Sequence, residues 1–511
     1  MVFNSVKYII FLPIVVLIYF LIPIRGEKNN QNLYRNIFLL IASYYLYMCW
    51  IPQYAILLFL CTIITYTTSI ILCHTENQSY RKILLITSII INLGILFTFK
   101  YYNFFIENIN AILQYLGITI NFKTSNLLLP VGISFYTFQT IGYTIDVYRR
   151  DVKTEKSFIN YALFVSFFPK LAQGPIEKSK SLLSQFKEIH QFEYLPAVKG
   201  MRIILLGMFK KVVIADTVAI YVNAVFNNVN EYSGLTLLLA VLLFAIQIYC
   251  DFSGYSDIAL GSSKLLGFKI MENFHAPYFS ESIGEFWNRW HISLNNWLKE
   301  YLYIPLGGSK KGFKRKLINL FVVFLLSGIW HGANWTYIIW GMLNGIYRIG
   351  QEIIRKCIKP LEFNYVVLYK VKKIIKIIIT FSLICLSWIF FRANTMNDAV
   401  HIIKYMFDST SITKLTQNFC SIVNENLINV RTMRYLYFGT IVIGIITLLT
   451  MDIIRCYKSN NVKPLEDIIC VKTNKFIRWI IYIVFVISII GMFLIQNGIY
   501  GQTGEFIYFQ F

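Results

Sequence analysis

A histidine lies in the middle of a strongly apolar stretch of this sequence. His331, in the segment SGIWHGANW (327–335), falls within the apolar run 317–347, which lysines and arginines bound on both sides. Either basic edge is about 15 residues from His331, or roughly 22 Å in a helix, most of the way across a hydrocarbon core of about 30 Å. An ionisable side chain at that depth is costly and therefore indicates a functional site, with packing between helices as the alternative. Gly332 and Asn334 predict a broken helix, which at this depth is tolerated only around a cavity.

A second histidine, His291, lies in the aromatic segment EFWNRWHISLNNWLKEYLYIPLGG (285–308). The large apolar residues of this segment are spaced by four, four, three and four positions: Phe286, Trp290, Leu294, Trp297 and Tyr301. This spacing predicts one amphipathic helix that lies in the membrane interface. An incidental histidine in an interfacial helix is the competing interpretation of His291.

Two carboxylates follow an apolar run in the segment YCDFSGYSDIA (249–259). Asp251 and Asp257 are expected at the end of a membrane span. There they either bind a polar ligand or cap and orient the next helix. The sequence favours neither interpretation over the other.

The composition is typical of an integral membrane protein. Of the 511 residues, 56% are hydrophobic, and the mean hydropathy is +0.56. We expect an all-α polytopic protein, a single membrane domain over residues 1–511, with ten to twelve spans. The first apolar run, 8–24, lacks a small-residue cleavage site and is expected to be a retained helix. The prolines and glycine of FFPKLAQGPI (167–176) predict a re-entrant or interfacial segment.

The net charge is +22, from 48 basic and 26 acidic residues. Cytoplasmic loops of membrane proteins collect Lys and Arg, and such loops also bind anionic lipid, which accounts for most of this excess. A basic cytoplasmic face would also attract an anionic donor that carries phosphates. We expect no nucleic-acid binding, because the chain has no compact soluble basic domain.

The nine cysteines are scattered and form no C-x-x-C pair and no Cys/His ligand spacing. This pattern argues against a zinc or haem site and against a disulfide framework. We therefore expect no metal and no permanently bound cofactor.

Five segments, in this order, resemble the membrane-bound O-acyltransferases and, more narrowly, their bacterial alginate O-acetyltransferase branch. They are LPVGISFYTFQ (129–139), FFPKLAQGPI (167–176), YCDFSGYSDIA (249–259), FWNRWHISLNNWLKEYLYIPLGG (286–308) and SGIWHGANW (327–335). The similarity covers about residues 129–347. It implies a bowl of tilted helices around a thin centre with a central histidine, through which an acyl group passes from a cytoplasmic thioester to an acceptor outside.

The resemblance also assigns roles to individual residues. The family's catalytic histidine falls on His331, and its second characteristic histidine falls on His291. Many relatives have arginine where this chain has Asn288, which weakens the expected contact with an anionic donor, although Arg289 is retained. Four residues are candidate substrate contacts: Arg289, Trp290, Asn334 and Asp251. Acyl transfer needs a base for the proton of the attacking hydroxyl, and a histidine in a dry site suits that step.

We therefore expect an O-acetyltransferase of the cell membrane. It would move acetyl groups from acetyl-CoA, a donor substrate, towards an extracellular or cell-wall polysaccharide, together with a partner transferase outside the membrane. One alternative is a D-alanyl exporter of teichoic acids that takes its acyl group from a carrier protein. An acyltransferase acting on lipid or protein and a non-enzymatic acyl or polysaccharide transporter are also compatible with the residues.

Basic residues predict the sidedness of the chain. The basic stretch 25–35 follows the first span, which places Met1 outside. The basic loop 285–316 is predicted to face the cytoplasm, where acetyl-CoA is found.

The C-terminal segment 497–511 contains no Lys or Arg and is predicted to lie outside. Its pattern Phe506-x-Tyr508-x-x-Phe511 resembles the C-terminal motif of a small partner peptide in teichoic acid D-alanylation systems. The resemblance implies that the tyrosine hydroxyl carries the acyl group in transit. We predict that Tyr508 relays an acetyl group to the outside partner, with an aromatic plug at the interface as the alternative.

Overall fold

The computed structural model describes residues 3–24, 32–358, 366–426, 431–457 and 474–500. This part of the chain is helical and contains no β-strand, so the predicted all-α class is confirmed. It divides into two compact units: residues 1–201 with 259–271, and residues 202–258 with 272–511.

Six helices in the described ranges are long and apolar enough to cross a membrane, by length and composition. They are α3 (Tyr54–His74), α4 (Gln78–Lys100), α12 (Leu235–Leu265), α17 (Val366–Arg392), α20 (Arg431–Tyr457) and α22 (Lys475–Tyr500). Another apolar helix, α1 (Val6–Leu21), is shorter. These helices make the chain a multi-pass membrane protein, and the figure of ten to twelve spans stays a prediction.

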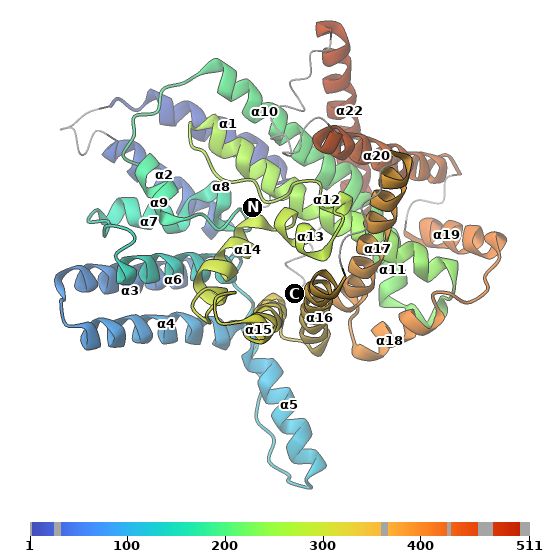
Figure 1. Cartoon of the computed structure of the whole chain (residues 1–511). Helices are drawn as coiled ribbons and strands as arrows, with labels where there is room; N and C mark the ends of the chain where they lie inside the picture. The colour runs from blue at the N-terminus through green and yellow to red at the C-terminus, as the bar shows by residue number, and fades with distance from the viewer. Residues whose placement is uncertain (1–2, 25–31, 359–365, 427–430, 458–473, 501–511) are drawn as a thin grey trace. The chain divides into compact units, whose positions relative to one another are not determined.

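The first unit packs shorter helices against α3 and α4. In Figure 1, α6 (Ile133–Arg149) runs alongside both. α2 (Leu33–Met48) packs against α7 (Phe158–Ser166) and α8 (Phe168–Leu171). The unit also contains α5 (Tyr102–Tyr115), α9 (Ser179–Gln185) and the start of α10 (Tyr194–Met208). The proline-containing segment 167–176 interrupts the helix as predicted, and it is buried within this unit throughout.

The second unit is built on a hairpin of α15 (Phe313–His331) and α16 (Trp335–Cys357), against which α17 packs (Figure 1). The break predicted near Gly332 is confirmed, because α15 ends at His331 and α16 begins at Trp335. In the described ranges, the second unit also contains α20, α22 and parts of α10 and α12. Its other elements are η1 (Phe209–Ala215), α11 (Asp216–Asn227), η2 (Val229–Glu231), η3 (Pro277–Phe279), α13 (Ile283–Arg289), α14 (Ile292–Leu298), η4 (Lys299–Tyr303), α18 (Met396–Tyr405) and α19 (Ile412–Asn426).

The prediction of a single amphipathic helix over residues 285–308 is wrong. The chain forms two short helices, α13 and α14, and the π-helical turn η4 follows. Between the helices, Trp290 is extended (φ −106°, ψ 128°) and His291 is left-handed (φ 45°, ψ 54°). Because this turn interrupts the helix, the regularly spaced apolar residues do not lie on one helix face. Phe286 and Trp290 are fully buried instead of lying at an interface.

Candidate active site

Two glycines bring α15 and α16 into backbone contact. A Cβ atom added at Gly341 would lie 2.6 Å from the carbonyl oxygen of Phe324 and 3.0 Å from the Cα atom of Gly328. Small residues at a helix interface permit this approach. His331 is the last residue of α15, so its position depends on this packing.

Three aromatic rings surround His331, and we call them the aromatic cage: Trp330, Trp340 and Phe391. Their centroids lie 4.8, 4.9 and 5.3 Å from the centroid of the imidazole ring. His331 is only 5% exposed. Apolar rings at this distance exclude water, which protects an activated acyl group from hydrolysis. The arrangement suits a histidine that acts as a general base.

The second tryptophan of the segment 327–335 is not one of the three cage residues. Trp335 lies close to His331 in the sequence, but it is 52% exposed at the start of α16. Trp340 and Phe391 supply walls of the cage, and Trp388 stacks on Trp340 at 6.0 Å with an interplanar angle of 17°. Trp388 and Phe391 both lie in α17 and could not be recognised from the sequence, because no residue type stands out in a uniformly apolar span.

Asn334 organises the connection between α15 and α16. Its side-chain oxygen accepts a hydrogen bond from the N–H of Thr336 at 3.0 Å, which caps the N-terminus of α16. Its Nδ2 atom donates to the carbonyl oxygen of Asn394 at 3.3 Å. Asn334 thus links this connection to the chain that follows α17. A contact between Asn334 and substrate stays a prediction.

His291 lies at the turn between α13 and α14 and is 1% exposed. Its ring contacts Phe252 edge-on at 4.7 Å and Trp330 at 6.3 Å. Neither α13 nor α14 is among the six membrane-spanning candidates. Burial lowers the pKa of His291 to about 3, so the imidazole is neutral at pH 7. Because Trp330 contacts both imidazole rings, the structure brings the two predicted histidines to the same indole ring.

Two asparagines hold the left-handed backbone of His291. Asn273 accepts hydrogen bonds from the N–H groups of the two residues that follow His291, at 3.0 Å through its carbonyl and 3.1 Å through its side chain. Asn295 donates through Nδ2 to the carbonyl oxygens of Trp287 and Trp290, at 2.7 and 2.6 Å. A left-handed conformation is unfavourable for a residue with a side chain and persists only where its surroundings impose it. These hydrogen bonds therefore fix the place of the imidazole.

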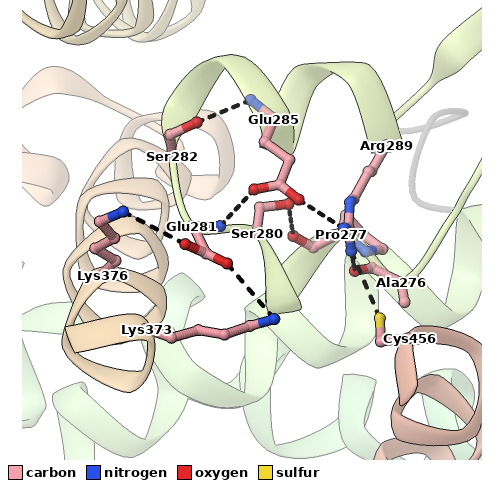
Figure 2. A network of polar contacts seen from close by, with 10 residues as sticks. All are labelled: Ala276, Pro277, Ser280, Glu281, Ser282, Glu285, Arg289, Lys373, Lys376 and Cys456. Atoms are coloured by element: carbon pink, nitrogen blue, oxygen red, sulfur yellow. Dashed lines mark hydrogen bonds and ion pairs between the residues drawn. The ribbon is translucent and has the colours of Figure 1, made fainter. Parts of the chain in front are cut away.

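Arg289 pairs with a neighbouring carboxylate, and Trp290 is buried. Figure 2 shows Arg289 paired with Glu285, one turn earlier in α13, at 2.6 Å between Nη2 and Oε1. Its Nη1 atom lies 3.5 Å from the Sγ atom of Cys456. Trp290 is 2% exposed and packs against Trp388 at 5.1 Å. Substrate contact by either residue stays a prediction, and the structure gives Trp290 a place in the core.

Asp251 forms a buried ion pair. Its carboxylate lies 2.6 Å from the ammonium of Lys211, which also pairs with Asp216 at 2.7 Å. Nearby, Lys210 pairs with Asp257 at 2.8 Å. The capping interpretation of Asp251 and Asp257 is wrong, because α12 continues past both residues. A ligand contact by Asp251 stays a prediction. Tyr508, the predicted acyl relay, lies outside the described residues.

The sequence matches the model of the membrane-bound O-acyltransferase family over residues 149–393, a range that contains His291, His331 and the whole aromatic cage. Together with the relatives below, this match shows that the chain belongs to the membrane-bound O-acyltransferase family and is an O-acyltransferase.

The chain is similar to bacterial O-acetyltransferases of alginate and peptidoglycan and, at lower identity, to a teichoic acid D-alanyltransferase. It is 39% identical over 411 residues to the probable alginate O-acetylase of Pseudomonas putida, which covers 80% of this chain and 80% of that protein. It is 34% identical over 458 residues to the peptidoglycan O-acetyltransferase of Helicobacter pylori, covering 83% and 84%. Identity to the teichoic acid D-alanyltransferase of Bacillus subtilis is 28% over 275 residues, covering 52% and 69%.

Proposed function

We propose that this protein takes acetyl groups from cytoplasmic acetyl-CoA and transfers them, across the membrane, for O-acetylation of an extracellular or cell-wall polysaccharide. The observation that carries the proposal is His331, buried in the aromatic cage of a chain that resembles alginate and peptidoglycan O-acetyltransferases. The acetyl assignment is favoured over D-alanyl transfer because the acetyltransferase relatives are more similar and align over more of the chain.

The chemistry follows from a base held away from water. The imidazole of His331 takes the proton of an acceptor hydroxyl while the hydroxyl oxygen attacks the thioester carbonyl. The new C–O bond forms, the C–S bond breaks, and the thiolate leaves and takes up a proton. Because the proton lost by the hydroxyl is regained by the thiol, the histidine returns to its starting state.

The basic net charge of the chain supports an anionic donor, since positive potential concentrates phosphate-bearing ligands. Outside the membrane, the immediate acceptor is either the polysaccharide or the hydroxyl of Tyr508. In the second case, Tyr508 would pass the acetyl group on to a partner transferase. Tyr508→Phe keeps the aromatic ring and removes only the hydroxyl. Normal polymer acetylation in this variant would exclude the relay.

The proposal is tested with membranes that contain the protein and acetyl-CoA labelled with ¹⁴C in the acetyl group. Label should appear in ester linkage on the polysaccharide, and it should be absent with His331→Ala. A carrier protein loaded with labelled D-alanine serves as the competing donor. Transfer from that donor, without transfer from acetyl-CoA, would establish the D-alanyl alternative. Acetate bound to the wall and to secreted glycan in a deletion strain reports the acceptor.

A further inference from the structure

A buried arginine lies beside the aromatic cage. Arg392 is the last residue of α17, directly after Phe391 of the cage, and is 5% exposed. The carbonyl oxygen of the nearby Asn394 accepts a hydrogen bond from Asn334, in the connection that follows His331. Arg392 therefore sits next to the candidate active site without belonging to the cage.

Only neutral groups surround this guanidinium in the described part of the chain. Its Nη2 atom donates to the side-chain oxygens of Asn223 at 2.9 Å and Asn227 at 3.3 Å, and Nη1 donates to that of Asn394 at 3.2 Å. The ring of Phe226 lies 5.4 Å from the guanidinium carbon. Within the described ranges, no carboxylate forms an ion pair with Arg392, and its buried Nε atom has no hydrogen-bond partner.

This environment distinguishes Arg392 from three buried cations that the structure describes in the same unit. Lys210 pairs with Asp257, Lys211 pairs with Asp216 and Asp251, and Arg455 pairs with Glu272 at 2.7 Å. A buried charge is costly unless an opposite charge compensates it. Arg392 therefore offers an uncompensated positive charge to a ligand.

The place of Arg392 in α17 puts it on the acceptor side of the membrane. Four lysines lie in the first half of this helix: Lys370, Lys372, Lys373 and Lys376. The excess of basic residues places that end in the cytoplasm. The 23 residues from Lys370 to Arg392 span about 34 Å as a helix, enough to cross the hydrocarbon core. Arg392 then lies at the extracytoplasmic end.

We propose that Arg392, with Asn223, Asn227 and Asn394, binds the carboxylate of an acidic saccharide on the acceptor side of the membrane. The planar guanidinium binds carboxylates through two parallel hydrogen bonds. Asn227 and Asn394 are exposed at the rim of the site and provide amide groups for sugar hydroxyls. A recessed cation of this kind admits a protruding carboxylate and positions the saccharide next to the cage. Only one part of this inference rests on the proposed function, namely that the bound saccharide is the acceptor of the acetyl group.

Binding is measured with the full-length protein in lipid nanodiscs and two probes that differ in one feature. The probes are tetragalacturonate and its methyl ester, which has the same sugar rings without the negative charges. The wild-type protein should bind the acid about 10- to 100-fold more tightly, the contribution typical of a hydrogen bond to a charged group. Arg392→Gln should remove this preference. Equal binding of the two probes by the wild type would overturn the proposal.

Asn227→Asp tests the site in a protein that keeps Arg392. The new carboxylate would lie where an amide oxygen now accepts from Nη2 at 3.3 Å, so it should occupy the guanidinium and abolish the preference for the acid. Asn230→Asp adds the same charge at an exposed position nearby and should retain the preference. If Asn227→Asp still prefers the acid, Arg392 does not bind the saccharide.

Two further measurements separate saccharide binding at Arg392 from the acyl-transfer chemistry and from the binding of an acidic protein. His331→Ala should keep the preference for tetragalacturonate, because it removes the proposed base and leaves Arg392 in place. Acetyl transfer that persists in His331→Ala, with binding intact, would therefore count against the proposed chemistry and not against the site. A tetraglutamate peptide that binds in an Arg392-dependent manner, while tetragalacturonate does not, would replace the saccharide with an acidic protein partner.

Discussion

The imidazole rings of His291 and His331 contact the same indole ring. The centroid of Trp330 lies 6.3 Å from that of His291 and 4.8 Å from that of His331. His331 is the chain neighbour of Trp330, whereas His291 comes from the turn between α13 and α14. One aromatic side chain thus joins the two histidines that the sequence marks as chemically capable, and their functions can be separated by substitution.

His331→Ala should abolish acetyl transfer while the protein inserts into the membrane at normal abundance. Removing a positioned general base costs about 10²–10⁴-fold in rate. The measurement is ester-linked acetate on polymer, normalised to the amount of protein in the membrane. His74→Ala is the control, because His74 is exposed at the end of α3. Normal acetylation by the His331 variant would remove this residue from the mechanism.

His291→Ala should raise the apparent KM for acetyl-CoA and leave the maximal rate near normal. The expectation follows from the place of His291 in the basic loop 285–316, which is predicted to face the cytoplasm and its acetyl-CoA, whereas His331 is the proposed general base. Initial rates measured over a range of acetyl-CoA concentrations separate the two parameters. A fall in maximal rate comparable to that of His331→Ala would make His291 part of the chemical step.

Asn295→Asp should release His291 from its buried position. The substitution keeps the shape of the side chain but removes the donors that bind the carbonyl oxygens of Trp287 and Trp290. Leaving a buried acceptor unsatisfied costs about 1–3 kcal/mol. Modification by diethyl pyrocarbonate, followed by mass spectrometry of the peptide that contains His291, should be faster than in the wild type. This readout does not depend on which reaction the protein catalyses.

Asn296→Asp is the matched control for this experiment, because it makes the same change one position later in α14. Asn296 has no side-chain hydrogen bond in the described part of the chain. Modification of His291 should stay at the wild-type rate in this variant. Equal rates in the Asn295 and Asn296 variants would show that the hydrogen bonds of Asn295 do not hold the histidine.

The position of the backbone break at His331 could be predicted from the sequence, but the turn at His291 could not. Gly332 and Asn334 are local signals, and Asn334 indeed caps α16. At His291, the regular spacing of aromatic residues indicates an uninterrupted helix. The turn depends on Asn273, whose hydrogen bonds come from another part of the chain. Tertiary contacts of this kind override local periodicity.

Apolar runs of the sequence, at 54–73, 83–99, 374–391, 435–451 and 476–495, predict the membrane-spanning helices α3, α4, α17, α20 and α22, since hydropathy alone determines them. The ion pair of Asp251 could not be foreseen. Lys211 and Asp251 lie in different helices, and their pairing depends on how those helices pack. Trp388 and Phe391 were likewise hidden, because a site residue in an apolar span differs from a lipid-facing one only in its direction.

Gly341→Ala should destabilise the hairpin of α15 and α16. The added methyl group would lie 2.6 Å from the carbonyl oxygen of Phe324, so the helices must separate. Overpacking of this kind costs about 1–3 kcal/mol. Gly350→Ala, in the same helix, meets no atom within 4 Å and should be neutral or stabilising by up to about 1 kcal/mol. Thermal unfolding in detergent compares the two variants, and equal unfolding temperatures would contradict the close contact.

The basic residues near one end of α15, α16 and α17 predict the sidedness of this part of the chain. Lysines precede α15, Arg355 and Lys356 lie in the last turn of α16, and lysines begin at position 370 in α17. These ends should face the cytoplasm, because Lys and Arg are retained there. Asn397 is exposed just beyond the opposite end of α17 and should therefore lie outside.

Cysteine labelling in intact cells tests this arrangement, in a background where the nine native cysteines are replaced. A membrane-impermeant maleimide should label Asn397→Cys from outside. It should label Lys310→Cys only after the cells are opened. Labelling of Lys310→Cys in intact cells would place the basic loop outside, away from cytoplasmic acetyl-CoA. It would also put Arg392 on the donor side, so that its uncompensated charge would face the anionic donor instead of an acidic saccharide.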